Sequence, residues 1–514
     1  MKDVNANATR EAPPPGLAER TVSDLFLYFP TIAIQGMVGI ITASFLSKLF
    51  SPGEYGNFIL AHGIYLLLGL LGGLWIERSV VRLLPEYKAK GRYLELAYTM
   101  IASEGLVVLA MTLISLGLLV GLRHMVSPGL FPLLVTAVTG AAFLSILTPV
   151  ASVYWVKGRS RVYSTLALTR VLGGLVAGLL LALPMRLGML GFLIGLNVPI
   201  VIILLVFAWL HHHTLRALFA KSRFSRAILR DVLTYGLPYL AMQITAMVLN
   251  FSDRYFIRIY SSASDVGIYN IGYTVAWQAM QLVFLVLATV ADPVIYRSLE
   301  ERGPAIAVSY VGRMLRYYTL AGVPCLIALF MLNKELVTLV STAQYIDAFP
   351  VVGYIGLASL IHGYTQIMAR IFAFRKKTGT LFAYFLSGCV LNIILNIIFI
   401  PLYGFMAAAW SALASYLALF AIMYRGAYRL YPFEFGWSYF LKTFSASAGM
   451  AVILYFCRHI APSAVVRTGV SVIAGLVSYG ALILLFRGVS LSEFGLLAKQ
   501  TKSYFCRAPR GGTA

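Results

Sequence analysis

Long apolar runs separated by short polar segments dominate the chain. A helix needs about 20 mostly apolar residues to cross the hydrocarbon core of a bilayer. Fourteen runs approach or exceed that length, and the pattern predicts a polytopic membrane protein, because a β-barrel would show short alternating segments. The runs cover residues 25–47, 55–76, 98–122, 131–156, 165–184, 189–210, 233–257, 266–292, 315–333, 349–372, 380–400, 404–424, 440–458 and 466–487.

Composition supports this interpretation. Of the 514 residues, 60% are apolar and 12% are charged, and the mean hydropathy is +0.83. A soluble protein carries about 25% charged residues, so this chain cannot cover a water-soluble surface. The composition excludes a soluble globular protein, a disordered chain and a disulfide scaffold. The four cysteines have no metal-ligand spacing, so we expect neither a metal site nor a cofactor.

Basic residues alternate between the two sides of the predicted membrane. With the N-terminus inside, 31 of the 41 Lys and Arg residues fall in cytoplasmic segments and 8 on the opposite side. This asymmetry follows the positive-inside rule and places both termini in the cytoplasm. It also explains most of the net charge of +22. Because the charge is spread over short loops with no folded basic domain, we expect no nucleic-acid partner.

The second half of the chain repeats features of the first half. Residues 51–58 (SPGEYGNF) follow the first predicted helix, and residues 262–269 (SASDVGIY) follow the seventh. Residues 30–35 and 238–243 each run from a proline to a glutamine. Six helices separate these matches, and six is even, so the two units enter the membrane from the same side. They are parallel repeats related by an axis along the membrane normal, as in transporters.

These features predict an all-α polytopic membrane protein with about 14 transmembrane helices. Two parallel six-helix lobes would surround a central cavity, and two further C-terminal helices would stand outside the repeat. The expected boundaries are a cytoplasmic tail 1–24, an N-lobe 25–210, a cytoplasmic inter-lobe loop 211–232, a C-lobe 233–424, two helices within 425–487 and a cytoplasmic tail 488–514.

Several local motifs occur in a fixed order within this frame. They are residues 49–56 (LFSPGEYG), 78–86 (RSVVRLLPE), 252–254 (SDR), 266–269 (VGIY) and 401–404 (PLYG). In these motifs the chain resembles the polysaccharide transporter (Wzx-type oligosaccharide flippase) family of the multidrug/oligosaccharidyl-lipid/polysaccharide exporter superfamily. The resemblance implies a bacterial cytoplasmic membrane protein that moves a polyprenyl diphosphate-linked oligosaccharide outward by alternating access. The glycan would serve O-antigen, capsule or exopolysaccharide synthesis.

The expected partners are that lipid-linked glycan and the membrane lipids. A polysaccharide polymerase, a chain-length regulator and a coupling ion, H⁺ or Na⁺, are further candidates. Two alternatives share the fold, namely a cation-coupled multidrug or small-molecule extruder and a lipid II flippase. A membrane-embedded glycosyltransferase or polymerase is an alternative of another class. The chain has no GxSxG, HExxH or paired-carboxylate arrangement, so we expect that it is not an enzyme.

A diphosphate that leaves water needs cations, and a glycan needs neutral hydrogen-bonding groups. Arg78 and Arg170 are predicted near the inner side, and Arg254 near the outer side, where it forms either a surface ion pair with Asp253 or a cationic lip. Mid-span amides and a histidine either bind sugar or join helices. The candidate substrate-binding residues are Arg78, Arg170, Asp253, Arg254, Arg258, Gln35, Gln243, Gln278, His362 and Gln366.

Four charged residues lie inside predicted spans but within about two turns of the cytoplasmic edge. They are Arg170, which is also a candidate above, and Glu104, Asp292 and Arg370. Long side chains at that depth can reach water, so we expect these residues to snorkel toward the surface.

Overall fold

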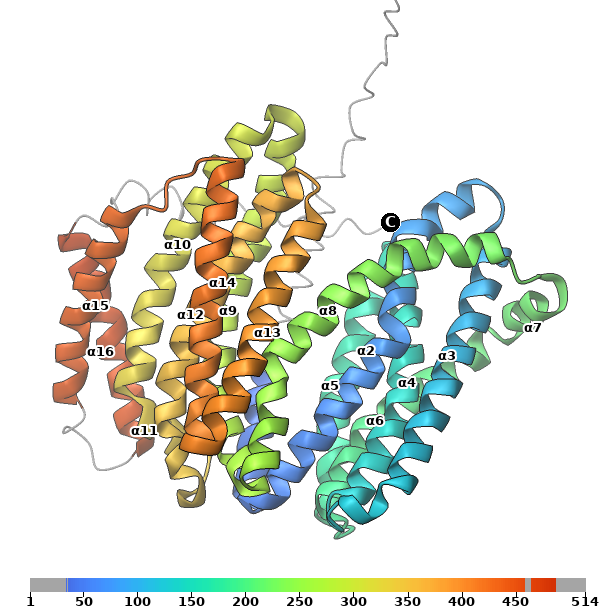
Figure 1. The fold of residues 1–514 in the computed structure, drawn as a ribbon, viewed down its shortest axis with the longest axis horizontal. Helices are drawn as coiled ribbons and strands as arrows, with labels where there is room; N and C mark the ends of the chain where they lie inside the picture. Colours follow the sequence, from blue (N-terminus) through green and yellow to red (C-terminus); the bar gives the residue numbers. More distant parts are fainter. Residues whose placement is uncertain (1–33, 35, 458–463, 487–514) are drawn as a thin grey trace, which may run out of the picture.

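The computed structural model describes residue 34 and residues 36–457 and 464–486 (Figure 1). In this part of the chain every regular element is a helix, and thirteen helices are long and apolar enough to cross a membrane. The described part of the first predicted span is the shorter apolar helix Gly36–Leu49. Together these helices match the fourteen predicted spans, which confirms the predicted fold class.

The N-lobe forms the bundle on the right of Figure 1. Besides Gly36–Leu49, it contains α2 (Pro52–Ala89), α3 (Tyr93–Gly121), the 3-10 turn η1 (Arg123–Met125), α4 (Phe131–Val156), α5 (Ser160–Ala182) and α6 (Gly188–Leu210). The short amphipathic helix α7 (His212–Lys221) follows it. This helix and the start of α8 lie within the segment 211–232, which the sequence suggested as a loop.

The C-lobe forms the central and left-hand part of Figure 1, and its first helix begins over the N-lobe at the upper right. It contains α8 (Arg226–Tyr260), α9 (Ala263–Arg302), α10 (Pro304–Met331), α11 (Asn333–Val340), η2 (Ala343–Ala348), α12 (Phe349–Phe374), α13 (Thr378–Tyr403) and α14 (Phe405–Leu430). The last two helices, α15 (Trp437–Cys457) and α16 (Ala464–Leu485), pack outside this lobe against α10. They stand outside the repeat, as the sequence predicted.

The two lobes pack their helices in the same order. In the N-lobe α2 packs against α3 and α4, and α6 packs against α4 and α5. In the C-lobe α9 packs against α10 and α12, and α14 packs against α12 and α13. The correspondence of these pairs confirms two parallel repeats.

The repeated sequence motif begins the second helix of each lobe. Ser51 Oγ accepts a hydrogen bond from Glu54 N at 3.4 Å, and Glu54 Oε2 accepts one from Ser51 N at 3.0 Å. In the second lobe Ser262 Oγ accepts a hydrogen bond from Asp265 N at 3.1 Å. These caps satisfy backbone groups at the first turn of α2 and of α9. They explain why a serine and an acidic residue recur three positions apart.

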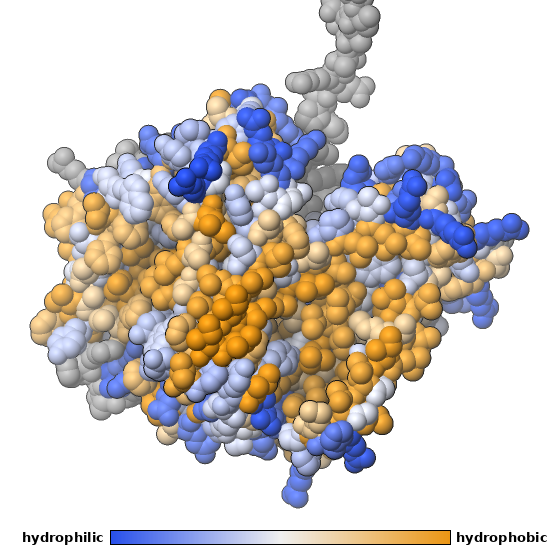
Figure 2. All heavy atoms as spheres, in the orientation of Figure 1, coloured by the Kyte–Doolittle hydropathy of each residue, from blue (hydrophilic) through white to orange (hydrophobic). Residues whose placement is uncertain are grey.

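Figure 2 shows a broad apolar band across the middle of the molecule, with hydrophilic residues along the upper and lower rims. Many large apolar side chains are exposed in this band; on α3 they include Leu106, Leu109, Leu113 and Ile114. A band of this kind is the surface that a membrane protein presents to lipid tails.

Candidate functional site

The two lobes meet where α2 and α9 begin, at the lower end of Figure 1, here called the contact end. A Cβ atom added to Gly56 would lie 1.8 Å from the carbonyl oxygen of Ala263. One added to Gly267 would lie 2.2 Å from the carbonyl oxygen of Pro52. The two glycines are equivalent in the repeat and make reciprocal contacts, so the axis that relates the lobes passes between them. Only glycine allows the backbones to approach this closely.

Side chains reinforce the contact end on both sides of the glycine pair. Tyr345 OH donates a hydrogen bond to the carbonyl oxygen of Phe50 at 3.0 Å. Asn270 Nδ2 donates one to Tyr55 OH, also at 3.0 Å. From this end the two bundles diverge toward the opposite end, here called the α7 end, at the top of Figure 1. There the first part of α8 lies over the N-lobe and packs against α2, and Ser79 Oγ donates to the carbonyl oxygen of Val232 at 2.9 Å. The structure therefore joins the lobes tightly at one membrane face.

Asp253 and Arg254 form an ion pair inside the C-lobe. Arg254 Nη1 lies 2.7 Å from Asp253 Oδ1, and the two residues are 1% and 2% exposed, respectively. Arg254 also donates to the carbonyl oxygen of Asn250 at 2.6 Å and stacks over the Tyr273 ring at 3.8 Å, while Tyr269 OH donates to Asp253. The pair is thus neither a surface ion pair nor an open lip. Its burial requires the partners that it has.

The polar contacts continue from this pair toward the middle of the C-lobe. Tyr416 OH donates to Asn250 Oδ1 at 2.5 Å. The His362 ring lies 5.0 Å from the Tyr416 ring and 5.2 Å from the Trp277 ring. Gln366 Nε2 lies 3.2 Å from His362 Nε2 and can donate to it. The structure therefore brings two predicted neutral groups, His362 and Gln366, into contact with each other.

A second ion pair completes the series at the α7 end. Arg370 donates to both carboxylate oxygens of Asp292, at 2.5 and 2.8 Å, and to the carbonyl oxygen of Gln366 at 2.7 Å. This two-point geometry is the strong form of an arginine–carboxylate contact. It differs from the expectation that both side chains snorkel separately. We call the whole series the C-lobe track: Asp292, Arg370, Gln366, His362, Tyr416, Asn250, Arg254, Asp253 and Asn270.

The two predicted N-lobe cations are less engaged. Arg170 on α5 is half-buried, and no described acidic residue forms an ion pair with it. Arg78 on α2 stacks over the Tyr239 ring at 4.6 Å and lies 3.9 Å from Glu77, with its side chain 31% exposed. Both charges remain available for a further anion.

The remaining candidates lie elsewhere. Gln243 and Arg258 are half-buried on α8, away from the C-lobe track's hydrogen bonds. Gln278 on α9 is half-buried and would be 2.6 Å from a Cβ atom added to Gly39. The prediction for Gln35 concerns a position outside the described residues.

Sequence reasoning missed several members of this polar network. Tyr55 and Asn270 join the two lobes although 215 positions separate them. Tyr416 links Asn250 to His362 from a third helix. The spacing of four residues between Asn250 and Arg254 was the one visible signal, because positions i and i+4 share a helix face.

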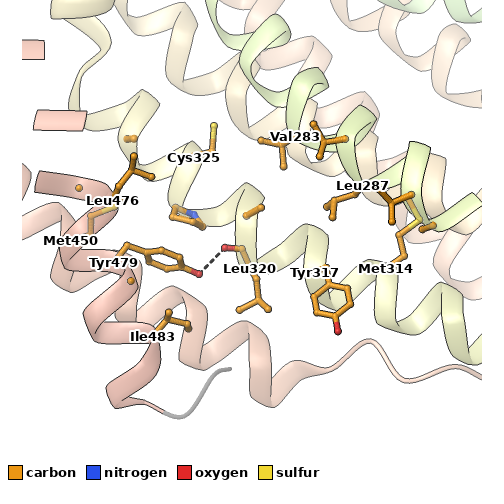
Figure 3. Close-up of a pocket in the computed structure, with 18 of the residues that line it drawn as sticks. Val283, Leu287, Met314, Tyr317, Leu320, Cys325, Met450, Leu476, Tyr479 and Ile483 are labelled. Carbon is orange, nitrogen blue, oxygen red and sulfur yellow. Dashed lines mark hydrogen bonds between the residues drawn. The ribbon is translucent and has the colours of Figure 1, made fainter. Parts of the chain in front are cut away.

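An apolar pocket with a volume of about 1090 Å³ lies between α9, α10, α15 and α16 (Figure 3). Leu287, Leu320, Met450 and Leu476 are among its lining residues. Arg313 also lines it and is nearer the α7 end, where α10 begins. The pocket is suited to an apolar chain with a cation beside it.

Several solved structures have the same architecture. The fold is similar to that of the lipid II flippase MurJ in an inward closed conformation, with a TM-score of 0.72 and 15% identity over 90% of this chain and 98% of that one. It is also similar to an inward-facing multidrug resistance MATE family transporter of the MOP superfamily, with a TM-score of 0.61 and 14% identity over 77% and 95%. A MOP superfamily transporter from Pyrococcus furiosus is similar as well, with a TM-score of 0.55 and 15% identity. That match covers 80% of this chain and 95% of the other. The fold is therefore that of a MOP superfamily transporter.

The sequence comparison identifies the family. The profile of the polysaccharide biosynthesis protein family matches residues 22–299, more than half of the chain. The chain belongs to this family, as its motifs indicated. No curated protein sequence matches it. The family is thus one of polysaccharide biosynthesis proteins, and the fold is the one that MurJ and the MATE transporters share.

Proposed function

We propose that the protein flips a polyprenyl diphosphate-linked oligosaccharide across the bacterial cytoplasmic membrane for surface polysaccharide synthesis. The α7 end faces the cytoplasm in this proposal, and both termini lie on that side. The family match and the two-lobed transporter fold support the proposal. The count of basic residues supports the orientation.

The observation that carries the proposal is Arg170, which lies within a membrane helix of the N-lobe and has no ion-pair partner among the described residues. An ionisable residue in a span is costly and marks a functional site by default. A diphosphate that enters the protein loses water and must be compensated by cations. Arg170, together with Arg78, supplies charge that no described carboxylate neutralises fully. Guanidinium groups also match phosphate oxygens in two-point contacts.

The arrangement of the lobes supports alternating access. The contact end is closed by the glycine pair, whereas the bundles diverge toward the α7 end. A substrate from the cytoplasmic leaflet would enter at the α7 end. Its release on the other side requires Gly56 and Gly267 to separate.

The apolar pocket between α9, α10, α15 and α16 supports a lipid-linked substrate. A polyprenyl tail is apolar, so the apolar lining of the pocket can hold part of the tail in place of bilayer lipid. Arg313 near the α7 end would lie beside the diphosphate of a lipid whose tail fills the pocket.

A cation-coupled small-molecule extruder is the second candidate, because the MATE transporters share the fold. The extent of the match favours the flippase. The MurJ structure covers 90% of this chain and the inward-facing MATE structure 77%. Helices α15 and α16, which line the pocket, stand outside the two six-helix lobes.

Complementation of a strain that lacks the gene tests the proposal. Wild-type protein should restore surface glycan and move lipid-linked glycan from the inner to the outer leaflet. Arg170→Ala should restore neither, whereas Arg161→Ala, which removes an exposed cation from the start of the same helix, should behave as wild type. Normal glycan display without the gene, together with increased sensitivity to small toxic cations, would favour the extruder.

A further inference from the structure

Glu104 is a buried carboxyl group in the N-lobe. It lies on α3, and the buried stripe of that helix includes Met100 and Val108, each one turn from Glu104. Glu104 is 6% exposed. The stripe faces α2 and α4, since a Cβ atom added to Gly72 of α2 would lie 3.2 Å from Val108 Cγ2 and 2.2 Å from Ser145 Oγ of α4. The side chain therefore does not snorkel to the surface as expected.

The carboxyl group has no partner among the described residues. Its Oε1 atom forms no hydrogen bond, and no described cation forms an ion pair with it. Ser103, beside it, donates to the carbonyl oxygen of Thr99 at 2.6 Å. Glu104 is thus an isolated acid among apolar helices.

Charged groups on the helices packed against α3 are engaged elsewhere or lie nearer the α7 end. On α2, Glu77 and Arg78 lie 3.9 Å from each other. Tyr154 is the one titratable residue of α4 and lies at its last turns. On α8, Asp231 accepts from Tyr87 at 2.7 Å. The other charged residues in the first turns of α8 are Arg226 and Arg230. The α7 helix carries histidines and basic residues, and its Phe219 contacts Tyr98 of α3. At the opposite end of α3, η1 carries Arg123 and His124.

An ionised carboxylate without a cation is expensive to bury, and a charge within a membrane span is costly. A protonated carboxyl group is neutral, and its burial costs far less. We propose that Glu104 is a proton-binding site, occupied in this conformation, and that the proton is the ion coupled to transport. The first part rests on the geometry of Glu104 alone, and the coupling rests on the proposed function.

The position of Glu104 connects its proton to movement of the lobes. Helix α2 packs against α3 and α4 on one side and against α8 and α9 on the other. Separation of α2 from α9 at the contact end would alter the packing of α2 on α3 and admit water to Glu104. A hydrated site binds the proton less tightly than a dry one. By thermodynamic linkage, a proton that binds the packed state more tightly also favours that state.

Infrared spectroscopy of the purified full-length protein tests proton occupancy without any substrate. The wild type at neutral pH should show the C=O stretching band of a protonated carboxyl group, and Glu104→Gln should lack it. Glu95→Gln is the matched control, because Glu95 lies on the same helix but its side chain is 42% exposed and pairs with Arg92 at 2.6 Å. Glu104→Asp, a second variant, should keep the band at a shifted frequency. A band that is absent from the wild type, or unchanged in Glu104→Gln, would overturn the proposal.

The pH dependence of unfolding gives an independent readout. The native state holds a proton that the unfolded chain releases above the ordinary carboxyl pKa of about 4.3. Stability therefore falls as pH rises, until the native site also loses its proton. Glu104→Gln should abolish this decrease of stability with pH, whereas Glu95→Gln should retain it. Parallel slopes in wild type and Glu104→Gln would contradict a bound proton.

Surface glycan measured in cells at several external pH values, with and without a protonophore, tests the coupling. The wild type should depend on the proton gradient, and Glu104→Gln should not respond to it. The same gradient dependence in both would show that the proton is only structural, and would overturn the coupling. Loss of the gene without any effect on glycan would instead refute the proposed function, while the infrared result would stand.

Discussion

The N-lobe and the C-lobe pack their helices alike but treat their membrane charges differently. In the C-lobe Asp253 pairs with Arg254 at 2.7 Å, and Asp292 pairs with Arg370 at 2.5 Å. In the N-lobe Glu104 and Arg170 have no described ion-pair partner. The same architecture therefore holds ionisable groups in ion pairs in one repeat and ionisable groups without a described ion-pair partner in the other.

This difference assigns separate roles to the two lobes. The C-lobe track joins α8, α9, α12 and α14 through its ion pairs, hydrogen bonds and ring contacts. If one partner of an ion pair in the C-lobe track is removed, the other charge stays buried without compensation. The charged residues of the track therefore maintain the structure. Unpaired charges in a membrane protein add nothing to stability. Their presence in the N-lobe supports roles in substrate and proton binding.

Arg254→Ala should have the largest effect on stability. It leaves Asp253 buried without its cation, which costs about 3–5 kcal/mol. Thermal unfolding of the purified protein would measure the loss, and Arg258→Ala, which alters a half-buried cation one turn away, should cost much less. A double variant, Asp253→Ala with Arg254→Ala, should cost less than the two single losses combined. Equal stability of Arg254→Ala and wild type would show that the pair is not structural.

Gly56→Ala should have the second largest effect on stability, because the added Cβ atom would lie 1.8 Å from the carbonyl oxygen of Ala263. Backbone atoms cannot rotate away, so α2 and α9 must move apart, at a cost of about 1–3 kcal/mol. Ser47, 1% exposed at the contact end, reports this movement. A cysteine at position 47 should react faster with a thiol reagent in Gly56→Ala. Gly117→Ala, with nothing within 4 Å, should leave the rate unchanged, and equal rates in all three proteins would argue against a closed contact end.

Tyr55→Phe should have a smaller effect. It removes the hydroxyl group that accepts from Asn270 at 3.0 Å, and a hydrogen bond of this kind contributes about 1 kcal/mol. The unfolding temperature should fall modestly, while Tyr260→Phe, at an exposed position (44%), should not change it. A Tyr55→Phe protein as stable as wild type would mean that this hydrogen bond contributes nothing to the contact between the lobes.

Hydropathy and repeats made most of the fold predictable. Apolar runs marked the helices, and the motifs at residues 51–58 and 262–269 revealed the two lobes. The periodicity did not reveal α11 and η2, because they are short elements between α10 and α12. The amphipathic α7 was also missed, since a polar segment between lobes is typical of a loop.

The candidate site was less predictable than the fold. Arg170 and Arg254 look alike in sequence, since each is an arginine in an apolar span. Their surroundings separate them. Arg254 pairs with its neighbour Asp253, and Asn270 and Tyr273 of α9 complete its environment. Arg170 has no ion-pair partner among the described residues. Pairing across helices depends on three-dimensional packing, which a single sequence does not show.

Arg170→Ala should have the smallest effect on stability, within about 0.5 kcal/mol of wild type, because the residue has no ion pair to lose. Its effect on transport should be large, since an unpaired cation would bind the substrate's diphosphate. Lysine keeps the charge but loses the two-point geometry, so Arg170→Lys should restore transport only in part.

The most direct test of the division between the lobes is surface glycan per unit of folded protein in the membrane. For Arg170→Ala we expect normal amounts of folded protein and at least a tenfold loss of glycan, equivalent to about 1.4 kcal/mol. For Arg254→Ala we expect glycan to fall in proportion to folded protein. Normal glycan in Arg170→Ala, or a specific transport loss in a fully stable Arg254→Ala, would contradict the assignment of function to the N-lobe charges and of structure to those of the C-lobe.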